Sequence, residues 1–250
     1  MEKPYLSIII PCYKEEKNLQ QTFPIFIKFV KSQNYSTELV FIEDGSPDNT
    51  TKFLQDSIKD YNFCRLIIHK KNLGKGMTVR DGMLIANGEV LLFADADNAT
   101  PIEQSNKLLS EIKNFDVVIG SRYKEKGHLK IKQPFYRILG ARFLNFMFKI
   151  FTGLKIQDSQ CGFKMFKAKP AKEIFSRQTF SRFSFDIEIL AIAKYLKYSI
   201  KEIPVDWYAK EKSTVHPVRD GFKFLWALII LRWNFLKGIY KKPNIKISNI

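Results

Sequence analysis

Two carboxylates follow directly on a short apolar run, and this feature restricts most strongly how the chain can fold. Residues 90–94 (VLLFA) are all apolar, which is typical of a strand buried on both faces of a parallel sheet. Asp95 and Asp97 come next, separated only by Ala96, and Asn98 follows as a turn signal. Open α/β sheets bind ligands at the carboxyl ends of such strands. A solvated turn is the alternative interpretation, but we expect a ligand site here.

Oxygen ligands at this position suit a hard divalent cation. Mg²⁺ and Mn²⁺ prefer carboxylate oxygens, and Mg²⁺ commonly takes substrate phosphate oxygens as further ligands. We therefore expect Asp95 and Asp97 to hold Mg²⁺ or Mn²⁺ together with a diphosphate. This in turn predicts a substrate that is activated by a nucleotide.

Further short apolar runs alternate with stretches of helical periodicity, which predicts βαβ units and a parallel sheet. We expect strands at residues 6–11, 38–42, 65–69, 89–94, 116–120 and 203–207. We expect helices at residues 17–32, 50–60, 76–86 and 102–114, and Pro24 should bend or restart the first of them.

The excess of positive charge lies entirely in the second half of the chain. The 250 residues carry a net charge of +16, yet residues 1–120 hold 14 basic against 16 acidic side chains. Residues 121–250 hold 27 basic against 9 acidic ones, so the two halves carry −2 and +18. A basic half can contact nucleic acid, anionic lipid or a phosphorylated acceptor. No nucleic-acid-binding signature is visible, so we expect no nucleic acid partner.

Two segments in this half combine apolar side chains with cations. Residues 134–154 are rich in Phe, Leu, Ile and Met, and residues 219–242 contain an apolar run (224–231) that Arg232 ends. That run is far shorter than the roughly 20 residues of a spanning helix. We expect amphipathic helices that lie on a membrane surface. Packing on the sheet or on another subunit is the alternative.

The cysteines and the N-terminus bear on the compartment. The chain has three cysteines, none of them in a CxxC pair or at zinc spacing, which fits a reducing compartment. The N-terminus leads straight into the first strand, and we expect no signal peptide. We therefore expect a cytoplasmic protein that is peripheral on the cytoplasmic face of a membrane.

Six motifs occur in a specific order along the chain. They are LSIIIPCYKEEKNL (6–19), FIEDGSPDNT (41–50), NLGKGMTVRDGM (72–83), LLFADADNAT (91–100), VVIGSRY (117–123) and DSQCGFKMF (158–166). The set resembles family 2 glycosyltransferases with the GT-A fold, over about residues 4–215. Within them it is most similar to the polyprenyl-phosphate sugar transferases, namely dolichyl-phosphate glucosyltransferases and dolichol-phosphate mannose synthases. The resemblance implies an α/β fold with a Rossmann-like, mostly parallel GT-A sheet flanked by helices, followed by C-terminal amphipathic interfacial helices.

The resemblance also implies roles for individual positions. The substrate-binding residues would be Pro11, Tyr13, Glu15, Asp44, Lys75, Asp95, Ala96 and Asp97, with Asp95 and Asp97 as the metal ligands. The residues acting in catalysis would be Asp97, Arg122, Arg137, Asp158, Gln160 and Lys212. Among them, Arg122 and Arg137 would hold the phosphate of the acceptor, and Lys75 would meet the diphosphate. Taken alone, the E-D-G-S sequence at residues 43–46 is more simply a turn.

The reaction that the resemblance implies is inverting, metal-dependent transfer of a hexose from a nucleotide sugar to a polyprenyl phosphate, either dolichyl or undecaprenyl. The glucosyl-like motifs favour UDP-glucose over a GDP-hexose. A phosphate acceptor needs no general base, because its second pKa is about 6 and it is mostly ionised near neutral pH. The alternative is a family 2 enzyme that acts on a sugar hydroxyl, for which Asp158 would be the base.

The sequence departs from the family pattern at two positions. Ala99 stands where mannose synthases often carry Gln or Ser, so no third side-chain metal ligand is evident, and Glu43 replaces the first acid of the usual D-D-G-S. We expect a catalytic domain at residues 1–215, including an acceptor loop and amphipathic helix at 122–155. Residues 216–250 would then associate with the membrane, with a second copy or with a membrane partner subunit.

Overall fold

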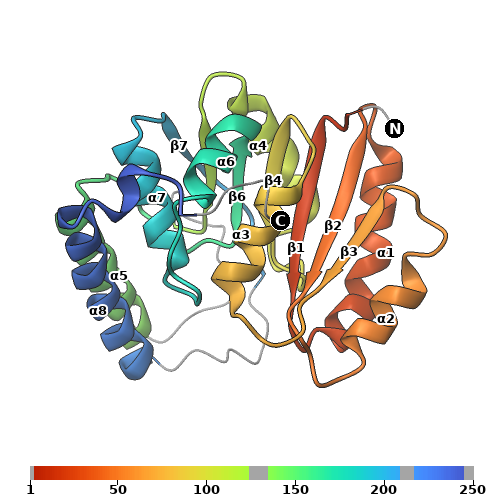
Figure 1. Ribbon diagram of the computed structural model, residues 1–250, viewed down its shortest axis with the longest axis horizontal. Helices are drawn as coiled ribbons and strands as arrows, with labels where there is room; N and C mark the ends of the chain where they lie inside the picture. Colours follow the sequence, from red (N-terminus) through yellow and green to blue (C-terminus); the bar gives the residue numbers. More distant parts are fainter. Residues whose placement is uncertain (1–2, 124–134, 209–216, 245–250) are drawn as a thin grey trace.

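Seven strands form one mixed sheet in the order β3-β2-β1-β4-β6-β5-β7 (Figure 1). The computed structural model describes residues 3–123, 135–208 and 217–244. The strands are β1 (Leu6–Cys12), β2 (Thr37–Glu43), β3 (Cys64–Ile68), β4 (Val90–Ala94), β5 (Val117–Ser121), β6 (Phe163–Lys167) and β7 (Ile200–Pro204). The first four are parallel, β6 runs antiparallel between β4 and β5, and β7 is parallel to β5. The predicted mixed, mostly parallel α/β sheet is thereby confirmed.

Helices connect these strands and cover both faces of the sheet (Figure 1). They are α1 (Glu16–Ser32), α2 (Thr50–Ser57), α3 (Lys75–Ile85), α4 (Ser105–Ile112), α5 (Phe135–Thr152), α6 (Ala168–Phe175), α7 (Phe185–Tyr195) and α8 (Pro217–Leu236), with two short 3-10 helices, η1 (Ile102–Gln104) and η2 (Ile239–Lys241). Pro24 lies inside α1, which continues without restarting.

Side chains of the central strands alternate between two cores, because successive residues of a strand point to opposite faces. Ile8 of β1 joins the core beneath α1, where Phe23 is buried. Ile9 joins the core on the opposite face, together with Val79 and Met83 of α3. Burial on both faces explains why the first strands are continuous apolar runs. It also holds their carboxyl ends in fixed positions.

The structure corrects the sequence analysis in the second half of the sheet. The last strand is Ile200–Pro204 and not 203–207, and the sequence analysis had assigned neither β6 nor α6. The sequence of β6 is FKMFK, and two lysines within five residues conceal the apolar character of a buried strand. Lys164 is nevertheless fully buried, because its ammonium forms an ion pair with the carboxylate of Asp186.

Helices α5 and α8 lie side by side at the left edge of Figure 1. Their inner faces join the core that lies under α3, and Phe148 of α5 and Leu228 of α8 are both fully buried there. The predicted helices of the second half are therefore confirmed as helices. None of the helices within the described ranges is long and apolar enough to cross a membrane.

Candidate active site

The carboxyl ends of β1, β2 and β4 meet at one edge of the sheet. Cys12 pairs with Glu43 at the ends of β1 and β2, and the amide of Asp44 donates to the carbonyl of Cys12 at 2.9 Å. On the other side of β1, β4 pairs in parallel register. The turns that follow these three strands carry most of the predicted site residues. The structure thus brings together segments that lie more than 80 residues apart in the sequence, as expected for an open parallel sheet.

Asp95 follows β4 and forms an ion pair with Lys75. The Lys75 Nζ lies 2.5 Å from Asp95 Oδ1, and both side chains are partly exposed. Burial lowers the pKa of Lys75, but the carboxylates of Asp95 and Asp186 outweigh burial and leave the pKa raised. Gly162 packs against the same carboxylate so closely that a Cβ atom there would overlap it. The ammonium of Lys75 is therefore charged and lies beside the predicted metal ligands.

Backbone contacts fix the turn that carries Asp97. The Thr22 hydroxyl donates to the carbonyl of buried Ala96 at 2.8 Å, which ties the turn to α1. The amide of Ala99 donates to Asp97 Oδ1 at 2.9 Å. Asn98 has a φ of 52°, a left-handed conformation that asparagine tolerates better than most residues. The turn thus presents Asp95 and Asp97 from a fixed backbone.

The two carboxylates fit a cation that takes few ligands from the protein. Among the described residues no group of three or more His, Cys, Asp or Glu side chains could enclose a metal ion. Mg²⁺ often binds through one or two carboxylates and completes its coordination with phosphate oxygens and water. Asp95 and Asp97 at a strand end match that donor set. The buried methyl group of Ala99 confirms that this position offers no third side-chain ligand.

The carboxylates of the E-D-G-S turn are both engaged in holding backbone. Glu43 is fully buried and accepts from the amides of Gly45 and Ser46 at 3.1 and 2.6 Å. Asp44 accepts from the amides of Leu73 and Gly74 at 2.9 and 2.8 Å. Both carboxylates therefore have a structural role, although neither of them caps α2, whose N-cap residue is Asn49. Contact of Asp44 with a nucleoside stays a prediction.

The remaining residues predicted to line the nucleoside pocket follow β1. Pro11 is buried within the strand, and the ring of Tyr13 is 40 % exposed, so it can cover a bound base. Glu15 is half-buried and accepts from the Asn18 amide at 2.5 Å. These residues lie at the same sheet edge as Asp44. Their contact with substrate stays a prediction.

Arg122 and Asp158 form a bidentate ion pair after β5. Arg122 Nε and Nη donate to the two oxygens of Asp158 at 2.7 and 2.8 Å, and its backbone amide donates at 3.0 Å. The guanidinium also lies 5.4 Å from the Trp207 ring centre, within cation–π range. Burial raises the pKa of Asp158, but Arg122 overrides it and holds the pKa below its usual range. Asp158 is therefore ionised and is a weak base.

Buried charges lie directly beneath this site. The ammonium of Lys164 donates to the carboxylate of Asp186 and, at 2.5 Å, to the carbonyl of Cys161. Burial raises the pKa of Asp186, and the nearby ammonium groups of Lys164 and Lys75 oppose that rise. The family resemblance placed the acidic segment around Asp186 under the active site, but the sequence did not show Lys164 as its partner in this cluster. A lysine inside an apolar strand and an acid at the head of an apolar helix were its only signals.

Of the three remaining predicted residues, the structure describes only one side chain. Gln160 is exposed on the turn before β6, two residues from Asp158. Arg137 belongs to the first turn of α5, but its side chain lies outside the described residues, as does Lys212 entirely. The structure accordingly leaves the predicted roles of Arg137 and Lys212 untested.

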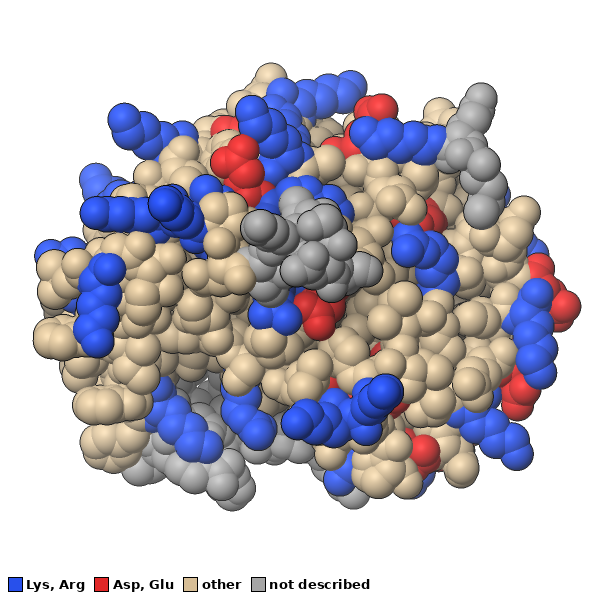
Figure 2. Space-filling view, in the orientation of Figure 1, with Lys and Arg blue, Asp and Glu red and all other residues tan. Residues whose placement is uncertain are grey.

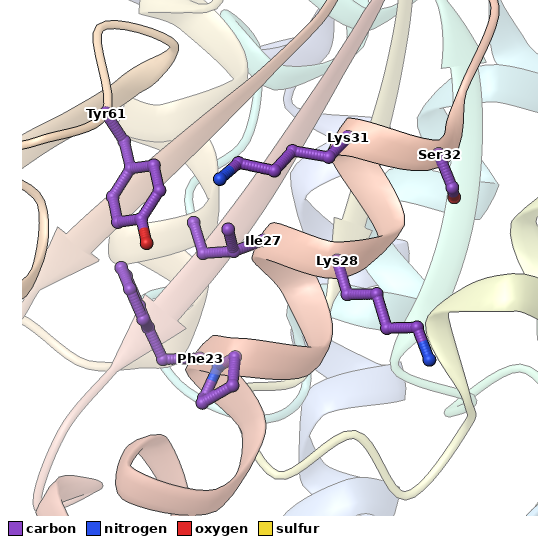
Figure 3. Close-up of a pocket in the computed structure, with 7 residues that line it drawn as sticks. Phe23, Ile27, Lys28, Lys31, Ser32 and Tyr61 are labelled. Carbon is purple, nitrogen blue, oxygen red and sulfur yellow. The ribbon is translucent and has the colours of Figure 1, made fainter.

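A separate groove of about 480 Å³ lies over α1 (Figure 3). Phe23, Ile27 and Tyr61 face one another there, and the Lys31 Nζ lies 5.1 Å from the Tyr61 ring centre. The lining residues include none of those predicted for the site. The groove is therefore distinct from the candidate active site.

Comparison with known proteins decides the family. The sequence pattern described as "Glycosyl transferase family 2" matches residues 7–175, which is most of the chain. The chain belongs to glycosyl transferase family 2. The resemblance stated from the motifs is thus confirmed, and this family 2 protein is a glycosyltransferase.

Relatives of this family 2 glycosyltransferase cover nearly its whole length. A dolichyl-phosphate beta-glucosyltransferase of Dictyostelium discoideum is 33 % identical over 95 % of this chain and 76 % of its own. A dolichyl-phosphate beta-glucosyltransferase of Saccharomyces cerevisiae is also 33 % identical, over 96 % of this chain and 78 % of its own.

A solved structure supports the fold of this family 2 glycosyltransferase. Glucosyl-3-phosphoglycerate synthase from Mycobacterium tuberculosis, in complex with Mn²⁺, UDP and glucosyl-3-phosphoglycerate, superimposes with a TM-score of 0.62. The match covers 96 % of this chain and 81 % of that one at 15 % identity, so it bears on the fold alone. The GT-A fold is confirmed.

Proposed function

We propose that this glycosyltransferase transfers glucose from UDP-glucose, with inversion, to the phosphate of a polyprenyl lipid such as dolichyl phosphate. The observation that carries the proposal is the 33 % identity to dolichyl-phosphate beta-glucosyltransferases along nearly the whole chain. The site geometry supports it at the donor end and at the acceptor end.

The donor end would bind the nucleotide diphosphate. Asp95 and Asp97 would hold Mg²⁺ or Mn²⁺. The structure of the mycobacterial synthase, which has the same fold, contains both Mn²⁺ and UDP. The bound cation supplies stabilisation of the negative charge on the departing diphosphate. Lys75 adds a second positive charge, because its ammonium is already beside Asp95. The exposed ring of Tyr13 would cover the base.

The acceptor end would bind a phosphate. A phosphate monoester attacks without a general base, since it is mostly ionised near neutral pH. We assign the acceptor phosphate to Arg122, because a guanidinium has five N–H donors and the contact with Asp158 uses one on Nε and one on Nη. The bidentate contact with Arg122 also makes Asp158 a poor base. This supports the phosphate acceptor over the hydroxyl acceptor that Asp158 would have to activate.

A lipid acceptor requires contact with a membrane, and α5 and α8 offer a surface for it. We call this surface the interfacial face. It consists of Phe143, Phe146 and Ile150 of α5 with Phe222, Trp226, Ile229, Trp233 and Leu236 of α8, each at least 50 % exposed.

The residues around the interfacial face favour a membrane as its partner. Helix α5 contains no acidic residue, and both Arg232 on α8 and Lys237 directly after α8 are exposed. Figure 2 shows the side over these helices as mostly tan, the colour of uncharged residues, with blue cationic side chains among them. Apolar patches of this kind mark interaction surfaces, and cations around them favour anionic lipids. We propose that the protein binds the cytoplasmic leaflet peripherally through this face.

The test is a transfer assay on the purified chain. The protein is incubated with Mn²⁺ or Mg²⁺, a short polyprenyl phosphate and a panel of UDP- and GDP-sugars, and lipid-linked sugar is measured by mass spectrometry. We expect glucosylated lipid phosphate from UDP-glucose alone. Metal-dependent hydrolysis of the donor without any lipid product would move the acceptor to a sugar hydroxyl. Product from a GDP-sugar would reject UDP-glucose.

The metal assignment has its own test. Replacing Asp97 by Ala should lower transfer by about 1000-fold, because the diphosphate loses its charge stabilisation. The fold should be intact, since the turn is also held through the backbone of Ala96. The exposed Asp60 replaced by Ala serves as the control. Near-normal turnover of the Asp97 variant would reject the assignment.

A further inference from the structure

His69 lies between two carboxylates just after β3. Its Nδ1 is 2.8 Å from Asp44 Oδ1, and its Nε2 is 3.3 Å from Asp81 Oδ2 on α3. The ring is only 10 % exposed. The amide of His69 also donates to the carbonyl of Glu43 at 2.8 Å, which fixes the position of its backbone. The imidazole thus bridges the end of β2 and the middle of α3.

Asp44 connects this bridge to the glycine-rich turn before α3. Its two oxygens accept from the amides of Leu73 and Gly74, the residues that immediately precede Lys75. Gly74 has a φ of +94°, and a Cβ atom there would lie 2.5 Å from the Ser181 carbonyl oxygen. The turn can therefore adopt only a narrow range of conformations. Its conformation decides where the Lys75 ammonium lies relative to Asp95.

We propose that His69 is a positioning residue for donor binding, which orients Asp44 and thereby holds the glycine-rich turn that aims Lys75 at the diphosphate. The proposal rests on the proposed function, because it assumes that Lys75 and Asp95 bind a nucleotide diphosphate. It adds a residue that contacts neither the donor nor the metal. His69 would act through two intervening hydrogen bonds and the peptide backbone.

The protonation state of the imidazole decides whether the bridge is complete. Only the imidazolium donates from both ring nitrogens, whereas neutral imidazole donates from one. The hydrogen bond that the imidazole donates to Asp81 raises the pKa of His69. Burial lowers this pKa, but the contact with Asp44 raises it further, so the pKa lies above its usual value. Arg80 is the other charged group in the cluster and donates to Asp81 at 2.8 Å. The bridge is therefore complete below the raised pKa and loses one bond above it.

Two substitutions separate the two halves of the bridge. His69→Asn keeps an amide donor near the position of Nδ1, towards Asp44. His69→Gln places its amide near the position of Nε2, towards Asp81, and leaves Asp44 without that donor. Both remove the titratable group. The exposed neighbour Lys70 replaced by Gln is the matched control.

The first measurement needs no ligand. Hydrogen exchange of the amides of Leu73 and Gly74 is compared between wild type and variants at one pH. We expect exchange about fivefold faster in His69→Gln, because a single hydrogen bond in this range of strength is lost. His69→Asn and Lys70→Gln should match the wild type. Equal exchange in wild type and His69→Gln would overturn the positioning role.

The second measurement links the bridge to the donor. The affinity for UDP with Mn²⁺ is measured by calorimetry from pH 6 to pH 9. As the pH rises, we expect the affinity of the wild type for UDP to fall, and this fall should be about fivefold larger than any fall for His69→Asn. His69→Gln should bind UDP weakly at every pH. Identical pH profiles for wild type and His69→Asn would overturn the coupling. Absence of UDP binding by the wild type would reject the proposed function, and hydrogen exchange would still decide the role of His69.

Discussion

At the scale of single residues, the Arg122–Asp158 ion pair shows how burial determines the contribution of an ion pair to the free energy of unfolding. The Asp158 side chain is 3 % exposed and that of Arg122 is 21 % exposed. Breaking a fully buried pair costs roughly 3–5 kcal/mol, because it leaves an uncompensated charge. We expect Asp158→Asn to lower the free energy of unfolding by about 2 kcal/mol, since water partly solvates the orphaned guanidinium.

Urea unfolding checks this prediction, and the pH dependence checks its cause. The lowered pKa of Asp158 means that its contribution is present above about pH 4 and is lost as the pH falls through the folded-state pKa. The difference between wild type and Asp158→Asn should therefore shrink below pH 4. Asp56→Asn, which breaks the exposed pair with Lys59, is the control and should leave the unfolding midpoint unchanged. A constant difference at all pH values would contradict the assignment.

A second prediction at this scale concerns the charge of Lys75. Lys75→Met removes the cation beside Asp95 and should lower kcat/KM by about 100-fold, the usual loss for a preorganised electrostatic contact. Stability should change little, because the ammonium is partly exposed. Steady-state rates with the donor sugar measure the effect. Lys71→Met, an exposed change in the same loop, is the control, and equal losses for both would point to a general charge effect.

The sequence predicted the residues at the strand ends better than the partners they contact. Asp95 and Asp97 could be placed at a strand end because they directly follow an apolar run. The local sequence is enough for that assignment. The Lys75–Asp95 pair joins residues 20 positions apart, and the packing of Gly162 on Asp95 joins residues 67 positions apart. Such contacts depend on the order of strands in the sheet. No local pattern contains that information.

At the scale of elements, the sequence predicted the apolar strands well and missed β6. Strands β1, β2 and β4 are buried on both faces, so each contains a continuous apolar run at residues 8–12, 39–42 and 90–94, respectively. In β6, Lys164 interrupts the run and is buried only because Asp186 of α7 neutralises it. The compensating charge lies 22 residues away and on another element. A strand that depends on a distant partner cannot be recognised from its own residues.

A prediction at this scale concerns the way η2 is attached to α7. The Tyr240 hydroxyl donates to buried Glu188 at 2.8 Å, and Glu188 also accepts from the amides of Thr179 and Phe180. Burial raises the pKa of Glu188, and these donors oppose that rise. Tyr240→Phe should therefore cost about 1 kcal/mol and should loosen residues 239–244.

Hydrogen exchange of residues 239–244 measures the loosening, and thermal unfolding measures the cost. Tyr195→Phe, at a half-exposed position on α7, is the control and should leave both unchanged. If Tyr240→Phe altered neither, the hydroxyl would contribute nothing, and packing of the Tyr240 ring against Phe235 at 4.6 Å would hold η2 by itself.

At the scale of the whole molecule, strand order connects the candidate active site to the core on which α5 and α8 pack. Inserting β6 antiparallel between β4 and β5 brings residues 158–162 next to the turn after β4. The chain then continues through α7 into the core that α5 and α8 also share. The sequence predicted both amphipathic helices, but it did not show that they lie side by side. Because the two helices pack against each other, their exposed apolar residues all lie on one helix pair.

The last prediction concerns the interfacial face, and the chain carries its own probe. Two of its three tryptophans, Trp226 and Trp233, lie on the interfacial face, and Lys237 lies 5.3 Å from the Trp233 ring centre. Tryptophan emission should shift to shorter wavelength when vesicles that contain anionic lipid are added, and salt should weaken the binding. Trp226→Ser together with Phe146→Ser should reduce vesicle binding by about 100-fold, because each removes a large apolar side chain from the lipid contact. The fold should be unaffected, since both side chains are more than half exposed. Ile25→Ser, an exposed apolar change on α1, is the control, and an equal loss of binding in that variant would reject α5 and α8 as the membrane contact.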